Sequence, residues 1–220
     1  MFRKITIPEL SIHPGRTAVI GPNGSGKTSL LMVLSGIALP KEGRITIDGV
    51  PPRQCEIGWV NEYPDRNMLF LRVRDEIASP LRFRNVPCSE ADAIVTRLAE
   101  KAGIGHLLPR PVKELSGGEK AIVALVTSVV SGPDVLVADE FDSHLDMETF
   151  EAAERLIIRS GASYCIQCTQ NIALAASCDH IAFISDGKVQ YYGTPGEVFK
   201  NLAGTCFYPF DWRIRNGTDL

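Results

Sequence analysis

Several features of secreted, membrane-spanning and nucleic-acid-binding proteins are missing from this sequence of 220 residues. The N-terminal stretch MFRKITIPEL holds no apolar run of the signal-peptide kind, and no apolar run reaches the roughly 20 residues that span a bilayer. The net charge of -3 does not indicate nucleic acid as a main partner. We therefore expect an intracellular protein that reaches a membrane only through another subunit and has no nucleic-acid partner.

Disulfide bonds are not expected either, although the chain contains six cysteines. A chain of this length without a secretory signal does not need disulfides to hold its core. Cys165 and Cys168 have the CxxC spacing of metal and redox sites, but they lie in YCIQCTQ, whose pattern is that of a buried strand. Because a metal or redox site needs a loop and further ligands, we interpret both cysteines as small core residues.

Short apolar strands alternate with helical segments along most of the chain, which predicts an α/β fold with a mainly parallel sheet. The Asp186-Gly187 turn predicts a hairpin and with it an antiparallel part of the sheet. Strands are expected at residues 17–20, 44–49, 56–60, 135–138, 163–168, 181–185 and 188–192. Helices are expected at residues 27–37, 121–132, 147–160, 171–177 and 195–202.

The stretch from 63 to 113 differs from this pattern because it contains no clear strand. SEADAIVTRLAEKAG (89–103) predicts an amphipathic helix that Ser89 caps and Gly103 ends. We expect a single domain with its core at 1–62 and 114–203, an inserted helical subdomain at 63–113 and a C-terminal tail at 204–220. The arginines of the subdomain are interpreted as a solvated face, with docking onto an acidic or membrane-associated partner as the alternative. They include Arg66, Arg72, Arg74, Arg82 and Arg84.

The most specific motif is GPNGSGKT (21–28), which matches the phosphate-binding pattern GxxxxGK[ST] between a predicted strand and a predicted helix. Glycines let backbone amides wrap around a triphosphate, Lys27 can reach the β- and γ-phosphates, and the Thr28 hydroxyl can hold Mg²⁺. An ordinary glycine-rich turn is the alternative. The residues expected to bind the nucleotide here are Gly21, Pro22, Asn23, Gly24, Ser25, Gly26, Lys27, Thr28 and Ser29.

A second motif, VLVADE (135–140), places two acids at the end of a predicted buried strand. In open α/β sheets ligands bind at the carboxyl ends of the strands. We expect Asp139 to hold Mg²⁺ through water and Glu140 to polarise the attacking water. The two motifs together predict a nucleoside triphosphatase in which Lys27 and Glu140 are catalytic.

ELSGGEKA (114–121) looks like the capped start of a helix with bare backbone amides. Its LSGGE part resembles the signature motif of ATP-binding-cassette (ABC) ATPases, and SHLD (143–146) resembles their D-loop. The resemblance covers nearly the whole chain and implies a P-loop NTPase fold of the ABC ATPase type, with ATP and Mg²⁺ as cofactors. It also implies a head-to-tail pair of cassettes, identical or different, in which Ser116, Gly117 and Gly118 contact the γ-phosphate held by the partner.

NEYPDRNMLF (61–70) and GTPGEVF (193–199) are similar to stretches of ATPases from energy-coupling-factor and cobalt/nickel importers. This resemblance implies the ATP-binding and ATP-hydrolysing subunit of an importer, cytoplasmic and peripheral on the inner face of the cell membrane. The inserted helical subdomain would bind a helix of an integral membrane subunit. Two alternatives are a degenerate or regulatory ABC subunit that binds ATP with little turnover, and a soluble ABC ATPase that acts on macromolecules.

The sequence also departs from the family pattern. Glu62 stands where the family has the Q-loop glutamine, and a carboxylate there can still approach Mg²⁺. Gln170 stands where the family has a switch histidine, and glutamine donates a hydrogen bond but carries no positive charge, so we expect slowed hydrolysis. Phe141 and Asp142 replace the usual proline and threonine. Phe2 is a candidate for stacking on adenine, but a phenylalanine at the start of a strand is more often a core residue. Weak base selectivity is therefore a further expectation.

Overall fold

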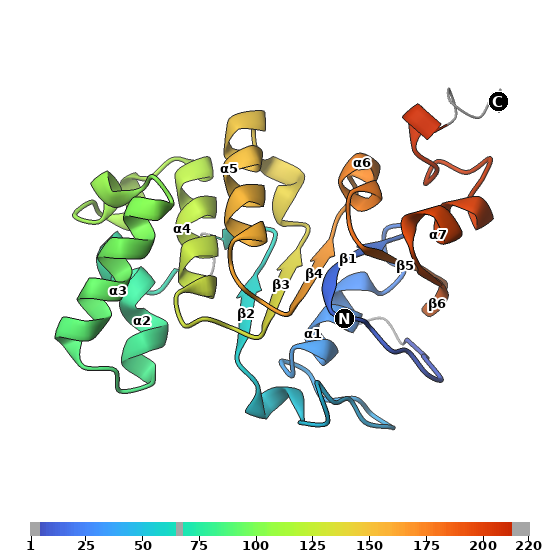
Figure 1. Cartoon of the computed structure of the whole chain (residues 1–220), viewed down its shortest axis with the longest axis horizontal. Helices are drawn as coiled ribbons and strands as arrows, with labels where there is room; N and C mark the ends of the chain where they lie inside the picture. Colours follow the sequence, from blue (N-terminus) through green and yellow to red (C-terminus); the bar gives the residue numbers. More distant parts are fainter. Residues whose placement is uncertain (1–4, 65–67, 213–220) are drawn as a thin grey trace. The chain divides into compact units, whose positions relative to one another are not determined.

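The computed structural model describes residues 5–64 and 68–212, which form two compact units (Figure 1). The first unit joins the residues up to Arg53 with those from Ser163 onward, and the second runs from Gln54 to Ala162. Phe2 and Arg66, both named above, lie outside the described residues.

The first unit is built on a sheet with the strand order β4-β1-β5-β6. β1 pairs in parallel with β4 and with β5, whereas β5 and β6 form an antiparallel hairpin. A parallel strand that is covered on both faces needs a continuous apolar run, which TAVI supplies at the buried end of β1. The predicted mixed sheet is confirmed here. The four strands are β1 (Gly15–Ile20), β4 (Tyr164–Cys168), β5 (His180–Ser185) and β6 (Lys188–Gly193).

Three helices belong to this unit: α1 (Lys27–Leu34), α6 (Ile172–Ala176) and α7 (Pro195–Asn201). The first helix is shorter than predicted because Gly36, with φ of 70°, turns the chain out of the helix. α7 packs on β5 and β6, and Phe199 on its inner face is fully buried. Trp212 meets Phe199 edge-on with ring centroids 5.3 Å apart, so part of the C-terminal tail packs against the core.

The predicted strand at 44–49 is wrong. The structure has only an isolated antiparallel bridge between Ile47 and Val50, which closes a turn through Asp48 (φ 49°) and Gly49 (φ 85°). The alternation of apolar and polar residues predicts a half-buried surface, but a strand also needs a partner with free backbone groups along its edge. Among the described residues RITID pairs only across its own turn.

The second unit contains two parallel strands, β2 (Ile57–Val60) and β3 (Val135–Asp139), in a register that pairs Val60 with Ala138. Its helices are α2 (Val73–Phe83), α3 (Cys88–Lys101), α4 (Gly117–Val129) and α5 (Met147–Ile158). α4 occupies the centre because it packs against β2, α2 and α5, while α3 packs on α2. Every residue of β3 is buried, in keeping with its apolar sequence VLVAD.

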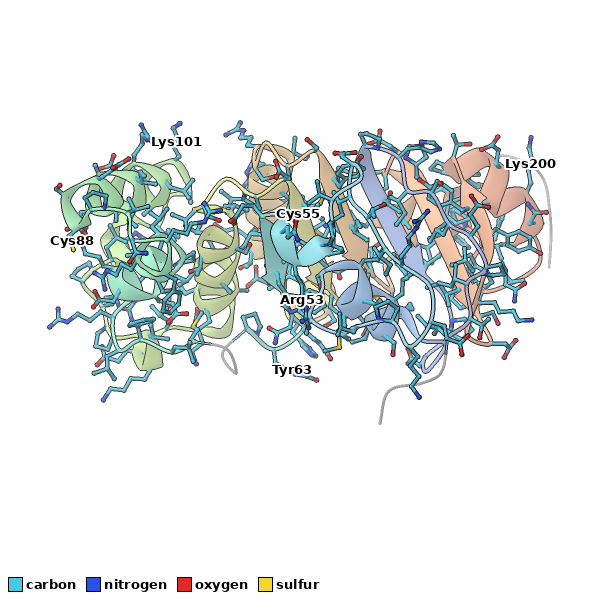
Figure 2. The ribbon with its side chains drawn as sticks, turned by 90° about the horizontal axis from the view of Figure 1, so that it is seen from below. Arg53, Cys55, Tyr63, Cys88, Lys101 and Lys200 are labelled. Atoms are coloured by element: carbon cyan, nitrogen blue, oxygen red, sulfur yellow. The ribbon has the colours of Figure 1, made fainter. Side chains whose placement is uncertain are left out.

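The helical character predicted for the stretch before α4 is observed in α2 and α3. Figure 2 shows Cys88 and Lys101, which mark the two ends of α3. The predicted cap at Ser89 is wrong, because the helix begins one residue earlier, after Pro87 with its fixed φ of -55°. Gly103, with φ of 75°, ends the helix as predicted.

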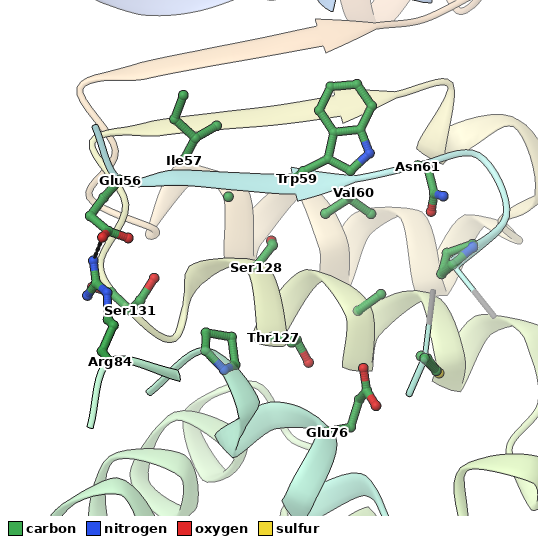
Figure 3. Close-up of a pocket in the computed structure, with 15 residues that line it drawn as sticks. Glu56, Ile57, Trp59, Val60, Asn61, Glu76, Arg84, Thr127, Ser128 and Ser131 are labelled. Atoms are coloured by element: carbon green, nitrogen blue, oxygen red, sulfur yellow. Dashed lines mark hydrogen bonds and ion pairs between the residues drawn. The ribbon is translucent and has the colours of Figure 1, made fainter. Parts of the chain in front are cut away.

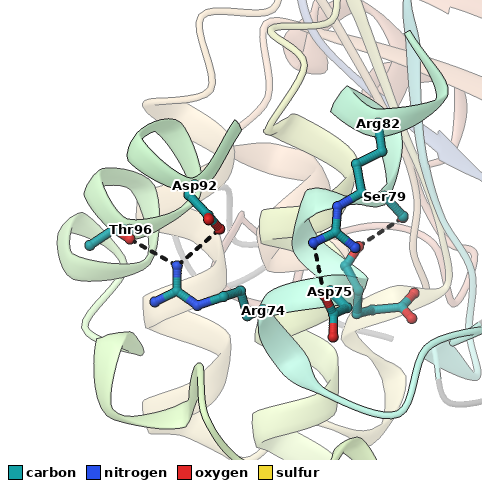
Figure 4. Close-up of polar contacts among 7 residues, drawn as sticks. Arg74, Asp75, Ser79, Arg82, Asp92 and Thr96 are labelled. Carbon is teal, nitrogen blue, oxygen red and sulfur yellow. Dashed lines mark hydrogen bonds and ion pairs between the residues drawn. The ribbon is translucent and has the colours of Figure 1, made fainter. Parts of the chain in front are cut away.

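Three arginines of the inserted helical subdomain form ion pairs with acidic side chains. Arg74 lies 3.3 Å from the carboxylate of Asp92, and Arg82 lies 2.8 Å from that of Asp75 (Figure 4). Arg84 pairs with Glu56 in the same way. Exposed pairs of this kind stabilise a protein by about 0–1 kcal/mol each, so they neutralise the surface more than they hold the fold.

Candidate functional site

The loop between β1 and α1 has a shape that only glycine permits at two positions. Gly21 has φ of 146°, and a Cβ placed there would lie 2.0 Å from the carbonyl oxygen of Ile184. Gly26 has φ of 109°, and its Cβ would lie 2.4 Å from the side chain of Ile5. Left-handed φ values and close approach both exclude larger residues, so the loop is fixed by its backbone.

Lys27 folds back over this loop. Its side chain is buried, and its Nζ donates to the carbonyl oxygens of Gly21 (3.1 Å) and Pro22 (3.3 Å). Ser25 Oγ is buried in the same loop with no hydrogen-bond partner among the described residues. A buried ammonium, an unsatisfied hydroxyl and the N-terminus of α1 together form an environment suited to a phosphate group. Thr28 is exposed beside them and Ser29 half-buried, both in the first turn of α1.

Gln170 lies beside this loop because β4 pairs in parallel with β1. The register matches Cys168 with Val19, and the Thr169 amide donates to the Val19 carbonyl. Two residues past β4, the Gln170 amide nitrogen lies 3.4 Å from Asn23 Oδ1. The contact is long and exposed, so it positions the amide only weakly.

In the second unit, three predicted carboxylates follow the ends of two paired strands. Asp139 is the last residue of β3 and is buried. Glu140 follows with φ of 46°, a conformation that is strained for a residue with a side chain. Because Val60 pairs with Ala138, Glu62 and Glu140 each come two residues after that pair, at the same edge.

A histidine without a role in the sequence interpretation joins this edge. Nε2 of His144 lies 3.5 Å from Oε1 of Glu62, and its ring centroid lies 5.2 Å from that of Tyr63. The sequence offered one signal for it, since His144 is part of the SHLD stretch. Local pattern alone could not indicate which side chain it would meet.

The predicted capped helix start at the signature is confirmed. Ser116 is the N-cap of α4, and its Oγ accepts from the Glu119 amide at 3.2 Å. Glu119 accepts in return from the Ser116 amide at 2.7 Å, and this hydrogen bond holds the pKa of the Glu119 carboxyl below its usual value. Arg110 adds an ion pair of 3.0 Å to the same carboxylate.

Gly117 and Gly118 supply the first amides of α4. A Cβ on Gly118 would lie 2.8 Å from Oγ1 of Thr149, so α5 closes one side of this helix start. A Cβ on Gly117 would meet no atom within 4 Å. The N-terminus of a 13-residue helix with uncovered amides attracts anions through its dipole.

Each unit, taken by itself, offers oxygen donors of the kind that Mg²⁺ binds beside a nucleotide. Within residues 5–64 and 68–212, no group of three or more His, Cys, Asp or Glu side chains forms a metal cage. Mg²⁺ does not need one, because it is commonly held by one or two protein oxygens together with substrate phosphates and water. The hydroxyl of Thr28 and the carboxylates of Asp139 and Glu62 are ligands of the required kind. Cys165 and Cys168 are both buried in β4, as expected of core residues.

Over the ranges that the structure describes, the helices are too short or too polar to cross a bilayer. The family model described as ABC transporter matches residues 6–143. The energy-coupling factor transporter ATP-binding protein EcfA1 of Lactiplantibacillus plantarum is 32% identical over 211 residues, covering 90% of this chain and 75% of that protein. The molybdate/tungstate import ATP-binding protein WtpC of Pyrococcus abyssi is 34% identical over 194 residues, covering 83% of this chain and 56% of that protein.

Among solved structures, cbiO1 from Clostridium perfringens, described as part of the ABC transporter complex cbiONQ, is similar throughout. It has a TM-score of 0.75 at 30% identity and covers 86% of this chain and 80% of its own. The dimeric cassette MJ0796 bound to ADP and Pi has the same fold, with a TM-score of 0.75 at 22% identity over 84% of this chain and 88% of that one. The chain therefore belongs to the ABC transporter family and is an ATP-binding-cassette ATPase of the energy-coupling-factor type.

Proposed function

We propose that this chain is the ATP-binding and ATP-hydrolysing subunit of an ABC importer, which couples ATP-driven pairing of two cassettes to transport by membrane subunits. The observation that carries the proposal is the phosphate loop, with its glycine-only backbone, its buried Lys27 and the unsatisfied Ser25 hydroxyl. The names of EcfA1, WtpC and the cbiONQ complex support an importer.

In this proposal residues 21–29 wrap the triphosphate, and Lys27 turns from its loop carbonyls to the β- and γ-phosphates. Thr28, Asp139 and Glu62 would offer oxygen ligands to Mg²⁺, which would supply charge neutralisation at the phosphates. Glu140 orients and polarises the attacking water, for which its strained backbone fixes the direction of the carboxylate. Gln170 donates its amide hydrogen to the γ-phosphate, so it replaces a cationic donor by a neutral one.

The signature serves a second cassette. Ser116, Gly117 and Gly118 offer their hydroxyl and amides to the γ-phosphate bound by a partner cassette, identical or different, in a head-to-tail pair. The capping box supports this role because the Glu119 carboxylate accepts from the Ser116 amide and pairs with Arg110, which fixes the start of α4. The amides of Gly117 and Gly118 take no part in these contacts. Preorganised donors lose little entropy when the anion arrives.

We further propose that the inserted helical subdomain, 63–113, meets an integral membrane subunit on the inner face of the cell membrane. A cavity of about 290 Å³ lies between β2, α2 and α4, and Glu76, Thr127 and Ser128 point into it (Figure 3). Buried Glu76 accepts from the amides of Leu69 and Phe70. This contact holds a loop on which Leu69 and Leu71 are 77% and 86% exposed, as expected of a docking surface.

The test is steady-state ATP hydrolysis by the purified chain beside Lys27→Ala and Glu140→Gln. We expect turnover in the parent chain, loss of ATP binding in Lys27→Ala, and retained binding without turnover in Glu140→Gln. A parent chain that binds ATP without hydrolysing it would instead support the regulatory alternative or an obligatory partner cassette. Co-purification with membranes of the source cell distinguishes the importer from a soluble ABC ATPase.

A further inference from the structure

The contact between His144 and Glu62 joins two segments that the chain brings together from far apart. Glu62 comes two residues after β2 ends, and His144 ends the short turn Phe141–His144 that begins directly after Glu140. The Ser143 amide donates to the Glu140 carbonyl at 3.2 Å and closes that turn. His144 and Glu140 therefore lie at the two ends of one short hydrogen-bonded turn.

Glu62 needs a donor beside it if its carboxylate is to point in one direction. Asp139 and Glu140 lie at the same strand edge, and like charges in one site repel one another. The Glu62 side chain is 37% exposed, so burial does not hold it. Nε2 of His144 lies 3.5 Å from Oε1 of Glu62, and an imidazole N–H can donate to a carboxylate, which an acidic or apolar neighbour could not do. The contact is as long as the one between Gln170 and Asn23, so it can orient Glu62 only if the imidazole is itself held in place.

His144 itself is oriented by Tyr63. The histidine side chain is 56% exposed, and its ring lies 5.2 Å from the Tyr63 ring at an interplanar angle of 34°. A ring contact of this kind limits the rotation of an otherwise mobile imidazole. Tyr63, Glu62 and His144 thus form a chain in which one aromatic ring orients a donor and the donor orients a carboxylate.

We propose that His144 is a positioning residue for ATP hydrolysis, whose Nε2–H holds the Glu62 carboxylate in the direction needed for Mg²⁺ and the nucleotide. It acts through Glu62 and does not itself touch the reacting atoms. This inference rests on the proposed role of Glu62 at the Mg²⁺ site.

The test is a double-mutant cycle with His144→Ala, Glu62→Ala and the pair, assayed for kcat, for the ATP KM and for the Mg²⁺ concentration that gives half-maximal turnover. We expect each single variant to lower kcat about tenfold and to raise the Mg²⁺ requirement, with the double variant no worse than Glu62→Ala. The ATP KM at saturating Mg²⁺ stays near that of the parent chain. His144→Gln, which keeps an N–H donor, recovers most of the lost kcat.

The matched control is His106→Ala, because His106 is an exposed histidine in the same unit. Parent-like kinetics in this variant would exclude a general effect of removing a surface imidazole. Effects of His144→Ala and Glu62→Ala that multiply in the double variant would overturn the proposal. So would a His144→Gln variant as defective as His144→Ala, or an unchanged His144→Ala.

The same cycle is also measured without turnover, as the gain in ATP affinity that Mg²⁺ produces in a Glu140→Gln background. Coupled losses in this affinity support the proposal even if the parent chain alone does not hydrolyse ATP. Independent losses refute it even if hydrolysis is fast. Failure of the proposed function and failure of this inference therefore give different results.

Discussion

The two units hold the residues proposed for ATP binding and hydrolysis by different means. In the first unit, the phosphate loop is fixed by backbone: Gly21 and Gly26 have conformations and neighbours that no larger residue tolerates, and Lys27 is buried on the loop. In the second unit, Glu62 and His144 are held by an exposed contact between side chains. The difference shows that the phosphate loop depends on the path of the backbone. The residues proposed to complete hydrolysis depend instead on side-chain contacts, which a single substitution can remove.

The largest expected effect comes from Gly21→Ala. Its Cβ would lie 2.0 Å from a backbone oxygen at φ of 146°, so the loop must move or the strand must open. We expect a loss of roughly 3 kcal/mol or more in the free energy of unfolding and no measurable ATP binding. Chemical denaturation and nucleotide titration measure the two effects.

Gly43→Ala is its matched control, since Gly43 also has positive φ (81°) but a Cβ there meets no atom within 4 Å. It isolates the backbone strain, about 1–2 kcal/mol, from the collision. Equal destabilisation of the two variants would mean that the collision with the Ile184 carbonyl oxygen adds nothing to the loss in the free energy of unfolding.

Gln170→His tests the proposed role of Gln170 as the hydrogen-bond donor to the γ-phosphate. The present amide contacts Asn23 only at 3.4 Å and carries no charge, whereas a charged donor makes a hydrogen bond about twice as strong. We expect turnover to rise about tenfold with little change in ATP affinity, measured under single-turnover and steady-state conditions. Gln190→His places the same change on exposed β6 and serves as control. Unchanged turnover in Gln170→His would remove Gln170 from the proposed mechanism.

Glu119→Gln tests the capping box behind the signature, with a smaller expected effect of about 1 kcal/mol. The hydrogen bond from the Ser116 amide lowers the folded-state pKa of Glu119 below the usual value of a glutamate. A lowered carboxyl pKa stabilises the fold above the unfolded pKa, and the stabilisation is lost as the pH falls through the folded pKa. Urea unfolding should therefore show the parent chain more stable than Glu119→Gln at pH 7, with the gap narrowing below about pH 4.5. A gap that does not depend on pH would contradict this.

The smallest effect is expected from removing an ion pair on the surface of the inserted helical subdomain. The Arg82–Asp75 pair has side chains 39% and 36% exposed, so a double-mutant cycle should give a coupling of about 0.2–1 kcal/mol that declines with added salt. A coupling well above this range would show that α2 depends on its surface charges. The comparison between backbone-held and side-chain-held regions would then need revision.

Most of the elements could be predicted because their causes are local. The apolar run of β3, the Asp186-Gly187 turn and the glycine stop at Gly103 act through their own backbone and nearest neighbours. Prediction failed where the outcome depended on a distant partner or on a neighbour's fixed dihedral. The strand at 44–49 found no partner along its edge, and Pro87 started α3 ahead of the cap expected at Ser89.

The sequence by itself determined the phosphate loop and the capped start of α4, because their glycines, Lys27 and Ser116 act within a few residues of one another. It also placed Asp139 and Glu140 at a strand end. Only the tertiary structure decided that Gln170 meets Asn23 and that His144 meets Glu62, contacts between residues far apart in the chain. Strand register sets such pairs, and register depends on the packing of the whole sheet rather than on the composition of any one segment.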